Sequence, residues 1–172
     1  MDPSRISLRP FRLSDVDDFF KWFTDVKVAK NLRWNPITST EEALSHLENI
    51  AIPNPTHYSI CLHDRSIGFI AFWPGTLADD KHKASIGYAV SADYWGQGIA
   101  TIALKIGLCR VFEDLANLVR VEAYTLADNG RSHRLLEKVG FVKEGLLRKW
   151  YNYRGEVRDS ILYSFLSTDK IL

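Results

Sequence analysis

The sequence has little of what marks several common protein classes. Its 172 residues include two cysteines, Cys61 and Cys109, too few for a disulfide framework or a cysteine-rich zinc site. The five histidines are scattered without metal-ligand spacing, so no metal is expected. No apolar run approaches the ~18 residues of a membrane-spanning helix, so no membrane partner is expected. The first residues form no apolar segment of the secretory type, and we expect an intracellular, cytoplasmic location.

An excess of charge of one sign is also lacking. Lys and Arg number 22 and Asp and Glu number 21, which gives a formal net charge of +1. Nucleic-acid-binding proteins usually show clustered positive charge, so no direct nucleic-acid partner is expected. Apolar residues make up 46% and charged residues 25% of the chain, as in globular proteins. Without repeats or linkers, residues 1–172 are expected to form a single domain that acts as a monomer or homodimer.

Strand patterns and helix patterns follow one another in an order that predicts the fold class. Seven segments have strand character, at residues 8–13, 57–63, 67–73, 84–90, 119–124, 141–151 and 157–166. Helical spacing of apolar residues follows Ser14, Ser39, the glycine-bearing loop at residues 95–100 and Asn129. The order strand–helix–strand over residues 84–124 implies a parallel pair with a right-handed crossover. We therefore expect an α/β fold, with a mixed, mostly antiparallel seven-stranded sheet flanked by helices.

The same patterns predict three local details. Ser14, with Asp17 three residues further on, is typical of the start of a helix. Arg65 and Ser66 are expected to form the tight turn between two strands. Cys109 follows an apolar position at helical spacing and is expected to lie in the core.

One segment carries most of the chemical information. Residues 87–101 read Gly-Tyr-Ala-Val-Ser-Ala-Asp-Tyr-Trp-Gly-Gln-Gly-Ile-Ala-Thr, which is a strand end, a glycine loop and a helix start. A helix N-terminus presents unpaired backbone N–H groups and partial positive charge. Gly96 and Gly98 let the backbone approach an anion closely. The segment predicts a pyrophosphate cradle; the alternative is a tight turn that needs two glycines only for its shape.

Residues 94–100, preceded by Ile86-Gly87-Tyr88, resemble the acetyl-CoA-binding motif of the GNAT acyltransferases. Residues 129–141, with Asn129-Gly130-Arg131-Ser132 at their start and Gly140-Phe141 at their end, resemble a second signature of the Rim-type branch of ribosomal-protein N-terminal acetyltransferases. The resemblance covers nearly the whole chain in the right order. It implies an N-acetyltransferase that uses acetyl-CoA, with the thioester lying between two parallel strands that end at Val90 and near Thr125.

The resemblance also implies roles for individual residues. The backbone of Ala89 and Val90 would pair with the pantetheine arm, and the Val90 N–H would donate to the thioester carbonyl. Asn129 would hydrogen-bond the pantetheine arm, and Ser132 would protonate the departing thiolate. The alternative for Ser132 is an ordinary hydroxyl in the first turn of a helix. Backbone amides would hold the pyrophosphate at Gly96, Gln97, Gly98, Ile99, Ala100 and Thr101.

The general base is left unassigned by these motifs. Ser85 stands where many relatives carry Glu before Ile-Gly-Tyr, and Tyr151 stands where some carry a carboxylate. Possible proton relays are His82, His133, Asp159 and Tyr151. Aromatic residues in two regions are expected to flank the acceptor channel in this fold, Trp34 with Asn35 and Pro36, and Trp150 with Tyr151 and Tyr153.

The expected reaction is acetyl transfer from acetyl-CoA to a primary amine by direct attack in a ternary complex. The acceptor is a protein N-terminus, a lysine side chain or a small amine. Two alternatives from other classes stay open at this point. One is a non-catalytic acyl-CoA-binding or sensing domain, and the other is a nucleotide-phosphate-binding regulator that uses the same loop.

Overall fold

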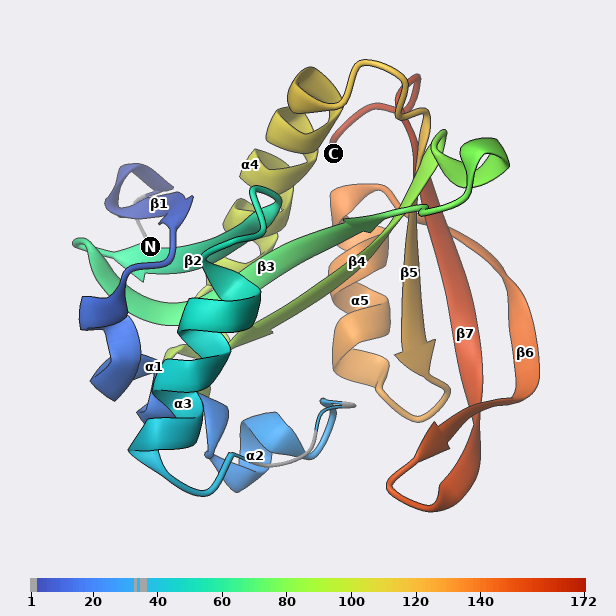
Figure 1. Cartoon of the computed structure of the whole chain (residues 1–172). Helices are drawn as coiled ribbons and strands as arrows, with labels where there is room; N and C mark the ends of the chain where they lie inside the picture. The colour runs from blue at the N-terminus through green and yellow to red at the C-terminus, as the bar shows by residue number, and fades with distance from the viewer. Residues whose placement is uncertain (1–2, 33, 35–36) are drawn as a thin grey trace. The chain divides into compact units, whose positions relative to one another are not determined.

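The computed structural model describes residues 3–32, 34 and 37–172. Its seven strands form one sheet in the order β1-β2-β3-β4-β5-β7-β6 (Figure 1). The strands are β1 Ile6–Pro10, β2 His57–Leu62, β3 Arg65–Pro74, β4 Lys83–Val90, β5 Arg120–Leu126, β6 Val142–Tyr153 and β7 Glu156–Leu166. The helices are α1 Val16–Phe23, α2 Val26–Ala29, α3 Thr40–His46, the π-helical turn η3 Leu47–Ala51, α4 Ile99–Asp114 and α5 Gly130–Val139. The predicted α/β fold with a mixed seven-stranded sheet is confirmed.

The chain divides into two compact units. The first comprises Met1–Ala71 and Tyr88–Gly107, and the second comprises Phe72–Gly87 and Leu108–Leu172. The expectation of a single domain over residues 1–172 stays a prediction, and Asn35 and Pro36 of the expected acceptor channel lie outside the described residues.

In the first unit, β1 pairs antiparallel with β2, and β2 pairs antiparallel with β3. The turn between β2 and β3 is formed by His63 and Asp64, whose φ angles are 50° and 65°. The prediction of a turn at Arg65 and Ser66 was therefore wrong by two residues. Two successive left-handed residues match the right-handed twist of a hairpin, and the alternation of apolar residues gives no sign of where such a turn falls.

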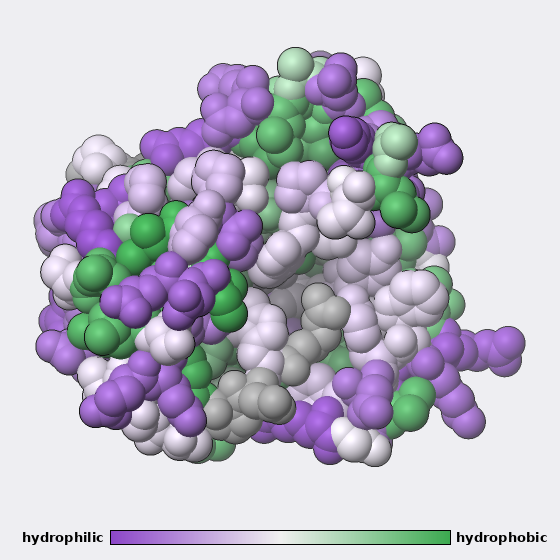
Figure 2. Space-filling model, in the orientation of Figure 1, coloured by the Kyte–Doolittle hydropathy of each residue, from purple (hydrophilic) through white to green (hydrophobic). Residues whose placement is uncertain are grey.

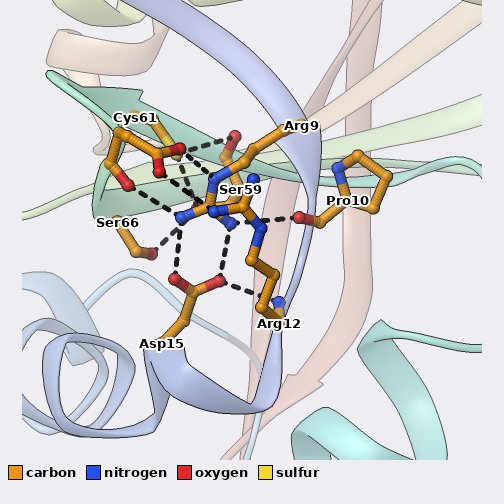
Figure 3. Close-up of polar contacts among 8 residues, drawn as sticks. Arg9, Pro10, Arg12, Asp15, Ser59, Cys61 and Ser66 are labelled. Atoms are coloured by element: carbon orange, nitrogen blue, oxygen red, sulfur yellow. Dashed lines mark hydrogen bonds and ion pairs between the residues drawn. The ribbon is translucent and has the colours of Figure 1, made fainter.

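The start of α1 is organised by Asp15. The Asp15 carboxylate accepts hydrogen bonds from the Arg12 backbone N–H at 2.9 Å and from both Nη atoms of Arg9 at 2.8 Å (Figure 3). The Arg9 Nε also donates to Asp64 at 2.7 Å, and the hydrogen bond to Asp15 is the largest of the effects that raise the pKa of Arg9. The prediction that Ser14 begins the helix was wrong, because Ser14 lies inside the 3₁₀ turn Leu13–Asp15 and α1 begins only at Val16.

An aromatic cluster holds the helices of the first unit together. The Phe19 ring stacks on Phe23 at 4.9 Å and on His46 at 5.4 Å, and the Trp22 ring stacks on Phe69 of β3 at 6.0 Å. These contacts join α1 to α3 and to the sheet. At the start of α3, which was predicted to follow Ser39, the Ser39 hydroxyl accepts the Glu42 backbone N–H at 3.2 Å.

The second unit contains the parallel pair. Residues Lys83–Ile86 of β4 are in register with Arg120–Ala123 of β5, and β7 pairs antiparallel with both β5 and β6. Figure 1 shows β7 lying between β5 and β6. Helix α5 begins after Asn129 and ends at Gly140, whose φ of 112° is the left-handed conformation that ends many helices. The start of this helix after Asn129 was predicted.

Cys109 is exposed, so the prediction that it lies in the core was wrong. The buried stripe of α4 includes Leu104, Leu108 and Val111. Successive residues of a helix point about 100° apart, so Cys109 turns away from its buried neighbour Leu108.

The outer surface mixes polar and apolar side chains. Figure 2 shows hydrophilic and hydrophobic residues interspersed over the face drawn. Within the described residues, every helix is too short or too polar to cross a bilayer.

Candidate active site

The predicted phosphate cradle is a loop followed by a helix. Gly96 and Gly98 have φ angles of +76° and +79°, and the Gly98 carbonyl accepts the first hydrogen bond of α4 from Ile102 N at 3.1 Å. The N–H groups of Ile99, Ala100 and Thr101 therefore occupy the first turn, where a helix offers no partner of its own. The conformation needs glycine at both loop positions, because L side chains rarely adopt such φ angles.

Space is open at the two glycines. A Cβ atom built on Gly96 or Gly98 meets no described atom within 4 Å. Both residues are also exposed to solvent. An anionic group approaching these backbone amides therefore meets no side chain at the two positions, which is the property that the cradle requires.

Two side-chain contacts hold the loop at the end of β4. The Trp95 indole N–H donates to the Val90 carbonyl oxygen at 2.7 Å, and the Gln97 amide donates to the Asp93 carbonyl oxygen at 3.3 Å. The hydrogen bond of Trp95 fastens the loop without contributing a charge.

The end of β4 lies close to Gly68 of β3. A Cβ atom on Gly68 would stand 2.3 Å from the Ala89 carbonyl oxygen and 2.9 Å from the Val90 Cα. Any side chain there would push the backbone of Ala89 and Val90 aside. Sequence reasoning missed Gly68, although an isolated glycine inside an apolar strand is a known sign of close backbone approach.

Asn129 and Ser132 meet at the start of α5. The Asn129 side-chain oxygen accepts the Ser132 backbone N–H at 3.3 Å, and the Asn129 amide donates to the Ser132 hydroxyl at 3.2 Å. Asn129 therefore caps the helix, and the Ser132 oxygen already receives one hydrogen bond. The Ser132 proton stays available for donation to another group, so the geometry is compatible with both readings of Ser132.

Three of the candidate proton relays, His82, His133 and Asp159, contact backbone groups through their side chains. A ring nitrogen of His82 lies 2.8 Å from the Asp79 carbonyl oxygen, and a ring nitrogen of His133 lies 3.1 Å from the Leu126 carbonyl oxygen. The Asp159 carboxylate accepts the Lys149 backbone N–H at 2.7 Å. These contacts give each of the three side chains a structural role.

Sequence reasoning missed a polar network on β5. The Tyr124 hydroxyl donates to Glu122 Oε2 at 2.7 Å, and Arg120 Nε donates to Glu122 Oε1 at 2.7 Å. Burial raises the pKa of Glu122, but the hydrogen bonds from Arg120 and Tyr124 outweigh burial, so the net pKa lies below its ordinary value. Alternation along the strand places Arg120, Glu122 and Tyr124 on one face, which is the signal that could have identified the network. Ser85 of β4 is in register with Glu122.

The residues present fit a thioester cofactor that carries a diphosphate. The glycine loop supplies backbone donors beside open space. No group of three or more His, Cys, Asp or Glu side chains in the described part of the chain is placed to hold a metal ion.

Comparison with known proteins identifies the family. The profile described as acetyltransferase (GNAT) domain matches residues 5–142. The uncharacterized N-acetyltransferase p20 of Bacillus licheniformis is 29% identical over 171 residues, covering 96% of this chain and 94% of p20. The ribosomal protein uS5-alanine N-acetyltransferase of Escherichia coli is 26% identical over 106 residues, covering 62% of this chain and 54% of that enzyme.

A solved structure agrees with these matches. Mycobacterium smegmatis RimJ in complex with a CoA disulfide has a TM-score of 0.75 and 27% identity to this chain, covering 94% of this chain and 82% of RimJ. The predicted resemblance is confirmed, and acetyl-CoA is the cosubstrate of an N-acetyltransferase activity. From its sequence profile, relatives and fold, the chain belongs to the GNAT acetyltransferase family.

Proposed function

We propose that this enzyme transfers the acetyl group directly to a primary amine within a ternary complex. The observation that carries the proposal is the loop from Trp95 to Thr101, with its two left-handed glycines and the helix start behind them. Acetyl-CoA supplies a thioester whose carbonyl carbon an amine can attack. A covalent acyl intermediate on Cys61 is disfavoured, because burial raises the pKa of this thiol and disfavours its thiolate.

Different residues of the chain bind different parts of acetyl-CoA. The backbone amides from Gly96 to Thr101 hold the pyrophosphate. The backbone of Ala89 and Val90 pairs with the pantetheine arm, and the Val90 N–H donates to the thioester oxygen as negative charge develops there. Asn129 binds the pantetheine arm, and the Ser132 hydroxyl supplies a proton to the departing thiolate.

The acceptor that we favour is the N-terminal amine of a protein. The support is the similarity to an enzyme whose name identifies it as an alanine N-acetyltransferase of a ribosomal protein. A lysine side chain or a small amine presents the same nucleophile. The amine needs to be neutral when it attacks, because an ammonium nitrogen has no lone pair.

Release of free CoA tests the proposal. The purified chain is incubated with acetyl-CoA and each of three acceptors: Ala-Gly-Gly-amide, Nα-acetyl-lysine amide and spermidine. We expect release above the rate of hydrolysis with at least one acceptor and intersecting double-reciprocal plots, which indicate a ternary complex. Binding of acetyl-CoA without turnover on all three, or parallel plots with a labelled acyl-enzyme, would contradict the proposal.

A further inference from the structure

The hairpin of β6 and β7 has an irregular stretch just before its turn. Three residues of β6, 148–150, face the single residue Asp159 of β7. The Asp159 carboxylate accepts the Lys149 backbone N–H at 2.7 Å, which fixes this bulge. Strand β6 is the last strand of the sheet, and the bulge interrupts its regular edge. A partner at this stretch is therefore recognised by side chains rather than by addition of a strand.

Two basic residues of this hairpin have a backbone conformation that such residues rarely adopt. Lys149 in the bulge has a φ of 50°, and Arg154 in the turn has a φ of 51° and precedes Gly155. Turns of this kind favour Asn or Asp before the glycine, and left-handed φ angles are uncommon for Lys and Arg. Strained positions are concentrated at functional sites, so a function of the two charges would explain why basic residues stand there.

Basic and aromatic side chains are concentrated in residues 148–158, here called the basic hairpin. This segment holds four of the 22 basic residues of the chain and one acidic residue, Glu156. Trp, Tyr and Arg occupy six of its eleven positions, and these residue types supply much of the binding energy in protein interfaces. Trp150 is 52% exposed and Val157 is 54% exposed. The segment therefore has the composition of a protein-binding surface.

Two positive charges of the basic hairpin are left without a carboxylate. Asp128 and Glu156 both lie against Arg158, with N–O distances of 2.7 Å and 3.9 Å. The Arg148 and Lys149 side chains are exposed, and neither forms an ion pair with any residue that the structure describes. Since opposite charges attract most strongly where no counter-charge is present, these two side chains are available to an anionic partner.

An acidic polypeptide fits the basic hairpin better than a nucleic acid does. Recognition of a DNA backbone commonly uses about 6–10 phosphate contacts, and this surface offers only a few basic side chains. The Trp150 ring lies parallel to the Tyr124 ring, with an interplanar angle of 7° and centroids 6.0 Å apart. The Tyr151 ring approaches Trp150 edge-on at 6.4 Å. These neighbours leave less of the indole for stacking with a base.

We propose that the basic hairpin is a docking surface for an acidic segment of another protein. Arg148, Lys149 and Arg154 pair with carboxylates of that segment, and the exposed Trp150 packs against one of its apolar side chains. The Arg154 guanidinium lies over the Tyr153 ring, 5.4 Å from its centroid, which holds this charge at the turn. All of these residues belong to one hairpin of the second unit. The inference goes beyond the proposed acetyl transfer and does not depend on it.

The test uses a peptide that has no free amine. The heptapeptide Glu-Gly-Glu-Leu-Glu-Gly-Glu, with fluorescein on its N-terminus and a C-terminal amide, is titrated with the full chain at low ionic strength and followed by fluorescence anisotropy. We expect saturable binding that weakens as salt is added, and no binding of the same peptide with Gln in place of Glu. The double variant Arg148→Gln/Lys149→Asn should bind about tenfold more weakly, because two exposed ion pairs are lost. Asparagine tolerates the left-handed φ and keeps the N–H that Asp159 accepts, so the urea midpoint should not fall.

Lys138→Gln/Lys170→Gln is the matched control. It removes two exposed positive charges from the same unit, outside the basic hairpin, and we expect it to bind the peptide like the parent. Unchanged affinity in folded Arg148→Gln/Lys149→Asn, or an equal loss in both double variants, would overturn the proposal. Tighter binding of an oligothymidylate of the same charge would also overturn it and assign the surface to nucleic acid. The probe cannot accept an acetyl group, so the result is independent of the proposed function.

Discussion

At the scale of single residues, the site depends on positions where the backbone accepts few alternatives. Gly96 and Gly98 have left-handed φ angles, and Gly68 allows the close approach of Ala89 and Val90. The two loop glycines could be predicted, because their place between a strand and a helix has a chemical meaning. Gly68 could not be assigned a role, because the atoms it approaches are about twenty residues away in the chain.

Gly98→Glu is expected to abolish acetyl-CoA binding. The new side chain would add bulk and negative charge where the loop amides should meet the pyrophosphate. Gly155→Glu is the matched control, because Gly155 also has a positive φ, 88°, and also has open space around it. Thermal shift with acetyl-CoA measures binding, and retention of the shift in folded Gly98→Glu would contradict the cradle.

Ser132→Ala is expected to lower turnover by about a hundredfold, the lower end of what general acid catalysis contributes, and to leave acetyl-CoA affinity nearly unchanged. The hydroxyl accepts a hydrogen bond from Asn129, so its loss also removes one contact at the start of α5. Steady-state kinetics and acetyl-CoA titration separate the two effects. Unchanged kcat would leave Ser132 as a helix-terminal hydroxyl only.

At the scale of elements, the first helix is attached to the sheet through charge. Asp15 at the start of α1 accepts two hydrogen bonds from Arg9 of β1, and the two side chains are only 6% and 13% exposed. The same guanidinium reaches Asp64 in the turn between β2 and β3. Sequence patterns predicted the helix and both strands, but the contact depends on the register of β1 with β2, which no local pattern contains.

Asp15→Ala is expected to lower the free energy of unfolding by about 3 kcal/mol, because it leaves the largely buried Arg9 side chain without its main partner. Asp64→Asn is the control on the same guanidinium. Asp64 is well exposed, and asparagine tolerates its left-handed φ, so a much smaller loss is expected. Urea unfolding measures both variants, and equal losses would argue against Asp15 as the anchor of α1.

At the scale of the whole molecule, the formal net charge is only +1. We therefore expect the pH dependence of folding stability to come from individual titrating groups. Burial lowers the pKa of His46, and burial followed by the charge of His46 lowers the pKa of His57. An unfolded histidine titrates near ~6.5. Below that value the unfolded chain binds protons that the folded chain resists, so folding stability present at higher pH is lost as the pH falls.

The urea midpoint is therefore expected to be lower at about pH 5.5 than at about pH 7.5, across the ~6.5 of an unfolded histidine. His46→Phe keeps an aromatic ring in the stack with Phe19 and Phe23 but cannot be protonated. The difference between the two midpoints should shrink in this variant. A difference of full size in His46→Phe would assign the pH dependence to other groups.

The sequence by itself determined the elements of this protein, its sheet class and the glycine loop of its site. Strand alternation, helical spacing and caps such as Ser39 and Asn129 act over a few residues, so the chain shows them directly. Only the tertiary structure decided that Arg9 meets Asp15 and Asp64, that Tyr124 lies between Glu122 and Trp150, and that Cys109 faces solvent. These contacts follow from strand register and from packing between distant segments, whose energies depend on the whole fold rather than on any one stretch of sequence.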